Sequence, residues 1–322
     1  MHTGSRVRNR TAPVVSGWPS THIPNDHPKS LPRTMPEPAV SHRHIDLRGL
    51  RLHVAEAGPA DGAPTILLHG FPEFWFGWRH QIEPLAGSGL RLLIPDQRGY
   101  GLSDRPKGIA AYHLDRLASD VIALADACGL ARVNLVGHDW GGLVAFWAAS
   151  FHPERVERLA VLNACHPGVF GPYLRRHPGQ ALRSAYAGFF QLPLVPERLL
   201  TARRGHLLRA LMRGSSRSGT FTEADLDTYA REWQRPGAVT AMLNWYRALA
   251  RLPRERHPPK VAAPTLILWG ERDRALQTGL AEASLGWCER GRLQRFPQAT
   301  HWVQHDVPEA VNAALIEFLR PS

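Results

Sequence analysis

The chain has 322 residues, which suffices for one sizeable catalytic domain with an insertion and a full buried core. Its formal charge of +11 comes almost entirely from arginine, and no nucleic-acid-binding module accompanies that charge, so we expect no nucleic-acid partner. The three cysteines are too few and too scattered for a disulfide framework or a zinc site, and the sequence has no Gly-rich phosphate loop. We therefore expect no cofactor, no metal and a reducing, cytoplasmic compartment.

Residues 1–40 differ in composition from the rest of the chain. They are rich in Pro, Ser, Thr, Arg and His and have no apolar periodicity, which predicts a disordered tail. The tail lacks the apolar core of a signal peptide and the length of a membrane span. Met35 is an alternative start, in which case residues 1–34 come from an over-long gene assignment and are not part of the natural protein.

From residue 41 onward, short apolar strands alternate with helical segments as far as residue 164, and strands resume at residue 264. Such alternation predicts a mostly parallel sheet with helices on both faces. The stretch 166–258 breaks the alternation, because it is helix-like, rich in Arg, Leu and Ala, and has Pro at its joints. We predict that it is a helical lid inserted between two core segments, 41–165 and 259–322.

The most informative segment is Gly137-His138-Asp139-Trp140-Gly141-Gly142. It follows a run that predicts a buried strand and precedes a small, apolar run that predicts a buried helix. A strand, a turn of the form Gly-x-nucleophile-x-Gly and a helix together form the nucleophile elbow of an α/β-hydrolase. Asp139 occupies the position where Ser is usual. The alternative is an ordinary strand–helix turn in which Asp139 is the helix N-cap.

A carboxylate nucleophile favours one kind of reaction. A Ser that attacks saturated carbon forms an ether, whereas Asp139 forms an ester, whose carbonyl an activated water can attack. The sequence therefore indicates displacement at the sp3 carbon of an epoxide or alkyl halide and disfavours esterase, lipase or peptidase activity. The ester carbonyl develops negative charge during hydrolysis, and we expect the backbone N–H groups of Phe71 and Trp140 to bind it.

Two further apolar strands follow the lid, and each is followed by a candidate catalytic residue. Asp273 comes after the first strand and His301 after the second, in the chain order of an α/β-hydrolase triad. We predict that Asp273 orients His301, which activates the hydrolytic water. Glu271 is the alternative acid. His305 is the alternative base, at the start of the last predicted helix with Asp306 as its N-cap.

These motifs resemble those of the epoxide hydrolases of the α/β-hydrolase superfamily. The shared segments are His69-Gly70-Phe71-Pro72-Glu73, the Asp139 turn, the Asp273 turn and His301-Trp302, and the likeness runs from about residue 41 to the C-terminus. The resemblance implies an α/β-hydrolase fold, with a mostly parallel eight-stranded sheet flanked by helices and an inserted helical lid. The lid is most similar to that of the subgroup that includes the vertebrate membrane-anchored members.

The family uses two lid tyrosines, and the resemblance places them at Tyr186 and Tyr246. Tyr186 shortly precedes a Phe-Phe-Gln-x-Pro motif, and Tyr246 lies within Asn-Trp-Tyr-Arg. An opening epoxide develops an alkoxide, a poor leaving group that two phenols can bind and protonate. The resemblance thus implies hydrolysis of an epoxide to a vicinal diol. Aromatic packing within the lid is the alternative role for both rings.

Two other functions stay open. A haloalkane or haloacetate dehalogenase uses the same Asp nucleophile, but its halide needs N–H donors and no acid. Those relatives typically carry an amide side chain in place of Phe71, or an arginine in place of Trp140. A non-catalytic ligand-binding protein of this fold is expected to have a degraded triad, whereas every part is present in this sequence.

The predicted lid is the densest basic region of the chain. A solvated surface is the plainer interpretation of this charge. The sharper hypothesis is that the lid attracts an anionic epoxide such as an epoxy fatty acid, or rests peripherally on an acidic membrane. Its densest part, between residues 175 and 217, has Glu197 as the only acid and contains Arg175, Arg176, Arg183, Arg198, Arg203, Arg204, Arg209, Arg213 and Arg217.

Overall fold

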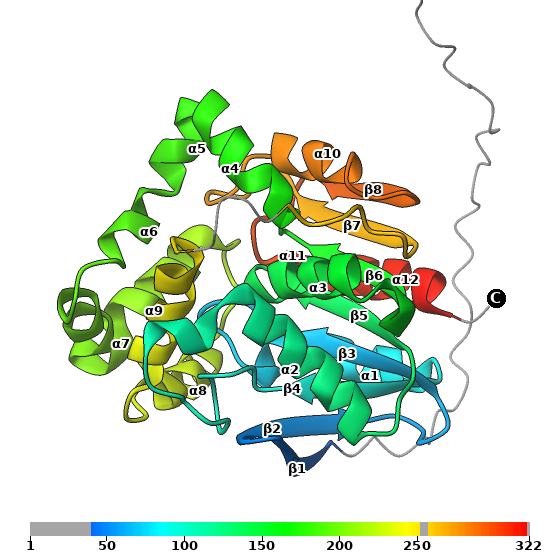
Figure 1. The fold of residues 1–322 in the computed structure, drawn as a ribbon. Coiled ribbons are helices and arrows are strands. Elements are labelled where there is room, and N and C mark those ends of the chain that lie inside the picture. The colour runs from blue at the N-terminus through cyan, green and yellow to red at the C-terminus, as the bar shows by residue number, and fades with distance from the viewer. Residues whose placement is uncertain (1–39, 252–256, 321–322) are drawn as a thin grey trace, which may run out of the picture. The chain divides into compact units, whose positions relative to one another are not determined.

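The computed structural model describes residues 40–251 and 257–320. The predicted disordered tail, apart from its last residue, and the alternative start at Met35 lie outside the described residues. The centre of the fold is an eight-stranded sheet with the order β1-β2-β4-β3-β5-β6-β7-β8 (Figure 1). Strand β2 is antiparallel to β1 and β4, and the other neighbours pair in parallel. The predicted fold class is therefore confirmed. The strands are β1 Ser41–Leu47, β2 Leu50–Ala57, β3 Ala63–Leu68, β4 Leu90–Pro95, β5 Val133–His138, β6 Val156–Leu162, β7 Thr265–Gly270 and β8 Gly291–Phe296.

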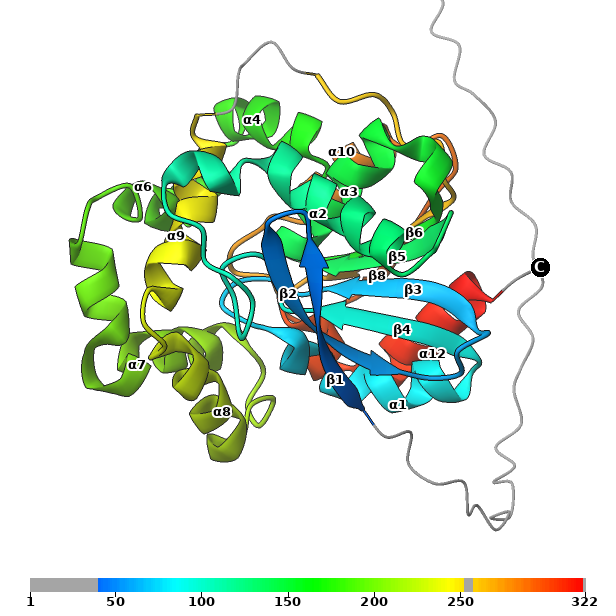
Figure 2. The ribbon, with the colours of Figure 1, turned by 60° about the horizontal axis from the view of Figure 1, so that its bottom comes forward.

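Helices cover both faces of the sheet (Figure 2). The buried strands are apolar on both sides: Ile66 and Leu68 of β3 belong to one hydrophobic cluster, and Leu67 between them belongs to the other. Helices α2 and α3 supply the first cluster, whereas α1 and α12 supply the second. This two-sided burial explains why these strands are continuous apolar runs. The helices of the core are α1 Arg79–Gly87, α2 Leu114–Ala127, α3 Trp140–Phe151, α10 Gly279–Leu285, α11 Val303–Asp306 and α12 Pro308–Leu319, with short 3-10 helices at Trp75–Trp78, Ile109–Tyr112 and Pro153–Arg155.

The described chain between β6 and β7 contains helices but no strand of the sheet, and we call α4–α9 the lid helices. Figures 1 and 2 show α6–α9 gathered beside one end of the sheet. Prolines open α4 and α5, where a missing N–H has no consequence for the helix. The lid boundaries proposed from the sequence, 166–258, enclose all six helices. They are α4 Pro167–Arg176, α5 Pro178–Arg183, α6 Ala185–Phe189, α7 Val195–Ser215, α8 Glu223–Trp233 and α9 Ala238–Leu249.

The strand order reverses next to β3. The chain moves from β3 to β4 on one side and then returns to place β5 on the other side of β3. Because β3 and β5 run parallel, the loops after them meet at the same edge of the sheet. Such a switch point is where open α/β sheets bind ligands.

The start of the last helix differs from the prediction. Asp306 ends α11, and Val307 is the N-cap residue of α12, with no side-chain cap. The carboxylate of Asp306 instead accepts hydrogen bonds from the backbone N–H and the hydroxyl of Thr300, at 2.7 and 2.6 Å, and from the hydroxyl of Thr220 at 2.6 Å. The predicted N-cap role of Asp306 is therefore wrong, since this side chain ties the loop before His301 to the lid. None of the helices within residues 40–251 and 257–320 is long and apolar enough to cross a membrane.

Candidate active site

The turn after β5 presents Asp139 in a constrained backbone conformation. Asp139 has φ 50° and ψ −119°, and it stands at the N-cap position of α3 without making a capping hydrogen bond. The turn is tight, because a Cβ on Gly141 would lie 2.1 Å from the backbone oxygen of Leu68. The carboxylate is thus free of the helix that it precedes, which disfavours the N-cap alternative. Strained turns of this kind occur at functional sites.

The loop after β3 supplies a hydrogen-bond donor to this carboxylate. The backbone N–H of Phe71 donates to Oδ1 of Asp139 at 2.9 Å. Close approach of the two loops needs a glycine, since a Cβ on Gly70 would lie 2.5 Å from the Cβ of Asp139. Trp140 is the first residue of α3, where a backbone N–H has no acceptor within the helix. Both predicted oxyanion residues therefore flank Asp139.

The predicted triad residues lie together at the ends of three strands. Nδ1 of His301 is 2.8 Å from Oδ2 of Asp273, and Nε2 of His301 is 3.5 Å from Oδ2 of Asp139. The alternatives lie elsewhere. Glu271 pairs with Arg295 at 3.8 Å, and His305 contacts Glu73, as described below. This geometry favours Asp273 and His301 over the neighbouring candidates.

Two carboxylates set the electrostatics of His301. Burial would lower its pKa, but the charges and hydrogen bonds of Asp273 and Asp139 outweigh burial and raise the pKa well above 6.5. Burial would likewise raise the pKa of Asp273, yet His301, the Leu276 N–H and Asn163 bring it below its ordinary value. The imidazole is therefore oriented with Nδ1 toward Asp273 and Nε2 toward the nucleophile.

Both predicted tyrosines stand above Asp139. The rings of Tyr186 and Tyr246 are 5.9 Å apart between centroids. Tyr246 also packs edge-to-face on Phe71 and Trp140, at 5.3 and 4.9 Å. Burial raises the pKa of both phenols. Tyr246 is the more deeply buried of the two, at 8 % exposure against 39 % for Tyr186. Both phenols are thus proton donors at neutral pH.

A buried arginine joins the two tyrosine motifs. Arg247 donates to the backbone oxygens of Phe190 and Leu192, at 2.9 and 2.7 Å, and pairs with Glu197 at 2.7 Å. In the opposite direction, the side chain of Gln191 donates to the backbone oxygen of Tyr246 at 3.2 Å. These contacts hold the segment after α6 against α9 and explain why the residues that flank each tyrosine are so distinctive.

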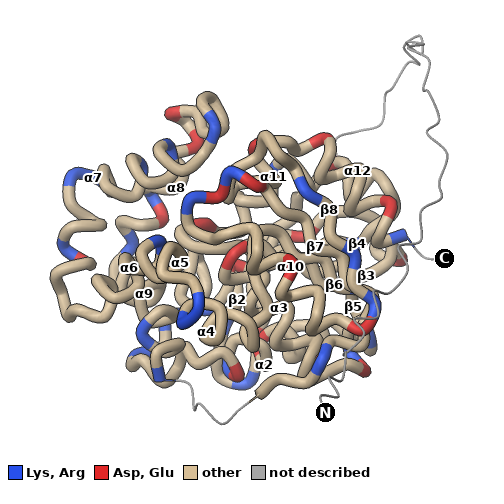
Figure 3. Tube along the Cα trace, turned by 90° about the horizontal axis from the view of Figure 1, so that it is seen from above, with Lys and Arg blue, Asp and Glu red and all other residues tan. Residues whose placement is uncertain are grey.

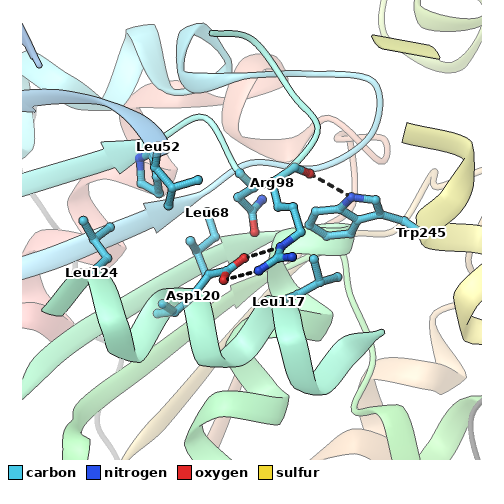
Figure 4. A pocket seen from close by; sticks show the side chains of 10 residues that line it. Leu52, Leu68, Arg98, Leu117, Asp120, Leu124 and Trp245 are labelled. Carbon is cyan, nitrogen blue, oxygen red and sulfur yellow. Dashed lines mark hydrogen bonds and ion pairs between the residues drawn. The ribbon is translucent and has the colours of Figure 1, made fainter. Parts of the chain in front are cut away.

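A second contact fixes α9 on the core. The indole N–H of Trp245 donates to the backbone oxygen of Arg98 at 3.1 Å, and the guanidinium of Arg98 forms a two-point ion pair with Asp120, at 2.7 and 2.6 Å (Figure 4). The space between these side chains is only about 10 Å³, so it has room for one water at most. This cluster fixes the neighbouring Tyr246 in the cavity that Asp139 also lines.

Two adjoining cavities meet at Asp139 and the tyrosines. The larger, of about 190 Å³, also has His301 and Trp302 in its wall. The smaller, of about 70 Å³, extends toward Cys165 and Phe170. Asp139, Tyr186 and Tyr246 line both cavities. A substrate can therefore extend to either side of the reacting carbon. Remaining wall residues are Phe71, Arg183, Leu211, Ser215, Arg274, Ala275 and Leu276 in the larger cavity, and Trp140, Leu143, Ser184, Ala187, Leu249 and Leu276 in the smaller.

Sequence reasoning assigned no role to Asn163, which lies at the end of β6. Its amide N–H donates to Oδ2 of Asp273 at 2.8 Å, and its amide oxygen accepts from the Gly270 N–H at the same distance. The side chain thereby fixes the acid of the triad. A polar residue directly after a buried strand was the available signal.

A buried carboxylate behind His301 was also missed. Glu73 contacts His305 at 2.8 Å, His138 at 3.3 Å and the hydroxyl of Tyr229 at 2.6 Å. Nε2 of His138 lies 2.9 Å from the backbone oxygen of His301. Burial would raise the pKa of Glu73, but His305 and His138 hold it well below its ordinary value. This network links the oxyanion loop, the elbow and lid helix α8 to the backbone of the base.

Comparisons with known proteins show the family to which this chain belongs. A family model described as the alpha/beta hydrolase fold matches residues 64–308. The chain is 42 % identical to the AB hydrolase superfamily protein YfhM of Bacillus subtilis (strain 168), over 87 % of this chain and 98 % of that protein. It is 37 % identical to the Homo sapiens Epoxide hydrolase 4, over 92 % of this chain and 83 % of that protein. The chain belongs to the epoxide hydrolases of the α/β-hydrolase fold.

Solved members of the family have the same architecture. One is the crystal structure of a mutant Bacillus megaterium epoxide hydrolase complexed with its product, a naphthyloxy-propane-diol. It has a TM-score of 0.79 and 29 % sequence identity, over 86 % of this chain and 99 % of that chain.

Proposed function

We propose that this protein hydrolyses epoxides to vicinal diols through a covalent ester on Asp139. One observation carries the proposal: a carboxylate at the elbow faces two phenols across a single cavity, with an imidazole beside its second oxygen. A carboxylate suits attack on saturated carbon, and the phenols suit an alkoxide leaving group. A halide leaves as a stable anion and has no need of a proton donor.

In the first step, Oδ2 of Asp139 attacks one carbon of the epoxide while Oδ1 stays bound to the Phe71 N–H. The ring C–O bond breaks and its electron pair goes to the ring oxygen, which takes a proton from Tyr186 or Tyr246. An ester between Asp139 and a hydroxyalkyl group results, together with a phenolate. The second tyrosine hydrogen-bonds the same oxygen, which lowers the barrier further.

In the second step, His301 takes a proton from water, whose oxygen attacks the carbonyl carbon of the ester. The N–H groups of Phe71 and Trp140 bind the oxyanion, which collapses and releases the alkoxide of the diol. Both protons of the water end on the alkoxide and the phenolate, which restores the enzyme. Ester formation removes the charge of Asp139, one of two that raise the pKa of His301, so the imidazole becomes a free base when it is needed.

The larger cavity supports a substrate with an acidic group on an apolar chain, such as an epoxy fatty acid. Arg183 and Arg274 line it, and each donates one N–H to a backbone oxygen, that of Asp273 at 2.9 Å and that of Gly214 at 2.7 Å. Neither guanidinium has a carboxylate partner within the described ranges. The remaining N–H groups of each guanidinium can therefore bind a substrate carboxylate.

Salt titrations of kcat/KM test this preference. We expect added salt to slow hydrolysis of an epoxy fatty acid more than that of its methyl ester, and Arg274→Gln to remove the difference. Arg290→Gln is the matched control, because Arg290 also donates to a backbone oxygen but is absent from both cavity walls. Identical salt effects on acid and ester would refute an acidic substrate.

The mechanism is tested with a His301→Gln variant, soaked with an epoxide and a haloalkane of the same carbon skeleton. Intact-protein mass should rise by the whole mass of the epoxide, and the gain should vanish when Asp139→Asn is added. A gain of the alkyl group alone, from the haloalkane only, would make the protein a dehalogenase. No adduct with either compound would favour a non-catalytic ligand-binding protein.

All three cysteines are free thiols, which is consistent with the reducing cytoplasm that we propose as its compartment.

A further inference from the structure

Helix α7 carries apolar side chains both on its buried side and beside it, on the solvent side. Its inner face buries Leu200, Leu208 and Met212 in the core cluster. Its outer face presents Leu199 at 49 % exposure and Leu207 at 45 %. The apolar side chains of a surface helix normally face the core and its polar side chains face solvent, so these half-exposed leucines depart from the usual pattern.

The exposed apolar side chains gather in one part of the chain. Within the described residues, every large apolar side chain of high exposure except Leu102 lies between Leu182 and Leu211. Leu182 and Leu194 are exposed by 79 % and 63 %. Figures 1 and 2 show α6 and α7 along the outer side of the lid, and Figure 1 shows α5 above them. We call the outward side chains that do not line the cavity the lid patch; they are Leu182, Leu192, Leu194, Val195, Leu199 and Leu207.

Arginines accompany the lid patch (Figure 3). Glu197, the only acid between residues 166 and 222, is paired with Arg247. Farther along α7, Arg209 and Arg213 pair with acids of α8. Between residues 166 and 204 all six arginines are exposed and have no carboxylate partner in the part of the chain that the structure describes: Arg175, Arg176, Arg183, Arg198, Arg203 and Arg204.

The backbone turns part of this surface outward. Leu194, at the N-cap of α7, has φ 63°, and Arg203 and Arg204, in a break within the helix, have φ 49° and 57°. Left-handed conformations are unfavourable for such side chains. Three strained positions therefore carry an exposed leucine and two unpaired arginines.

We propose that the lid patch docks on the surface of an anionic lipid bilayer, with its leucines in the interfacial region and its arginines on the headgroups. Exposed apolar side chains ringed by cations are the combination that binds such surfaces. Charge argues against a second copy of the chain as the occupant, because an isologous dimer would set the unpaired arginines of each patch against their own copies. The inference does not depend on the proposed function.

The docked face adjoins the entrance to the active site. Tyr186 and Leu211 are both exposed and both line the larger cavity. Leu211 lies one helical turn beyond Leu207 of the patch. An apolar substrate dissolved in the bilayer would therefore reach the cavity without crossing water.

Flotation of the full-length protein with vesicles tests the proposal, without any substrate. Wild type should bind vesicles of phosphatidylcholine with phosphatidylglycerol and bind pure phosphatidylcholine weakly. Leu194→Asn with Leu199→Gln should lower the partition coefficient by about tenfold or more, since each side chain loses its apolar transfer energy. Arg203→Asn with Arg204→Asn should lower it about fivefold for each arginine. Asn is chosen because it tolerates left-handed φ.

Leu102→Gln is the matched control, since Leu102 is 45 % exposed on the core and should bind as wild type does. Unchanged hydrolysis of a water-soluble epoxide and unchanged thermal unfolding would show that the variants are folded. No binding of wild type to anionic vesicles would overturn the proposal. So would binding that depends on the arginines alone, or a wild-type dimer that the leucine variant dissociates.

Discussion

Replacing Asp273 by asparagine should leave His301 in place with the wrong nitrogen protonated. Oδ1 of Asp273 accepts from the backbone N–H groups of Ala275 and Leu276, at 2.7 and 2.9 Å. Oδ2 accepts from Asn163 and His301, both at 2.8 Å. All four partners are donors, so an asparagine can satisfy only one of the two pairs.

The backbone pair decides which way the new amide turns, because those N–H groups cannot rotate. The amide oxygen then faces Ala275 and Leu276, and the NH2 group faces Nδ1 of His301. That nitrogen must accept, so the proton moves to Nε2, on the side of Asp139. A protonated Nε2 takes no proton from water, and we expect kcat to fall by about 10²- to 10⁴-fold. Attack on the epoxide needs no base, so its rate should stay within about tenfold of wild type.

Rapid-quench intact-mass measurement of a single turnover separates the two steps. The Asp273→Asn variant should accumulate the ester on Asp139 and release it slowly. Glu271→Gln is the matched control, since Glu271 lies two residues away and pairs with Arg295, and it should turn over normally. A variant slowed without accumulating ester, or a kcat within about tenfold of wild type, would refute the reasoning.

Three further outcomes follow from the site. Tyr246→Phe should slow ester formation by about 10²-fold and leave ester hydrolysis unchanged. Pre-steady-state rates of the two steps check this prediction. An equal slowing of both steps would contradict the role of Tyr246. The pKa of His301 in the folded protein is raised above 6.5, so its charge stabilises the protein fully below that pH and progressively less above it. The difference in unfolding free energy between wild type and His301→Gln should therefore shrink as pH rises. A difference that stays constant with pH would contradict the assignment. Glu73→Ala leaves two buried histidines, His138 and His305, without their carboxylate partner. It should lower the unfolding free energy by about 3–5 kcal/mol in chemical denaturation. Glu83→Ala, at an exposed position, should change it little.

Local pattern sufficed for the fold. Buried strands are continuous apolar runs because helices cover both faces of the sheet, and α2 repeats its buried side chains at helical spacing. The error at Asp306 arose because its partners, Thr300 and Thr220, belong to other segments of the chain. A local rule favours an N-cap wherever Asp precedes a helix, whereas the hydrogen bonds of a side chain depend on everything that is near it in space.

Candidate residues were also found by their place in the chain. Asp139, Asp273 and His301 each follow a strand, and parallel strands bring their carboxyl ends to one edge. Their competitors lie only two and four residues away, so composition and order cannot separate them. The distances between side chains separate them: His301 contacts Asp273, whereas His305, in α11, contacts Glu73.

The sequence by itself determined most of the elements, the α/β-hydrolase architecture and the choice of Asp139 as the candidate nucleophile, because these depend on periodicity and on short motifs whose residues are neighbours along the chain. Only the tertiary structure decided what Asn163, Glu73 and Arg247 do, and that the outer face of α7 is left uncovered. Asp273, the partner of Asn163, and His305, a partner of Glu73, lie more than 100 residues away along the chain, and Glu197, the partner of Arg247, lies 50 residues away. Contacts at such separations leave no periodic trace in a single sequence, since they arise from the way that the sheet and the lid are brought together.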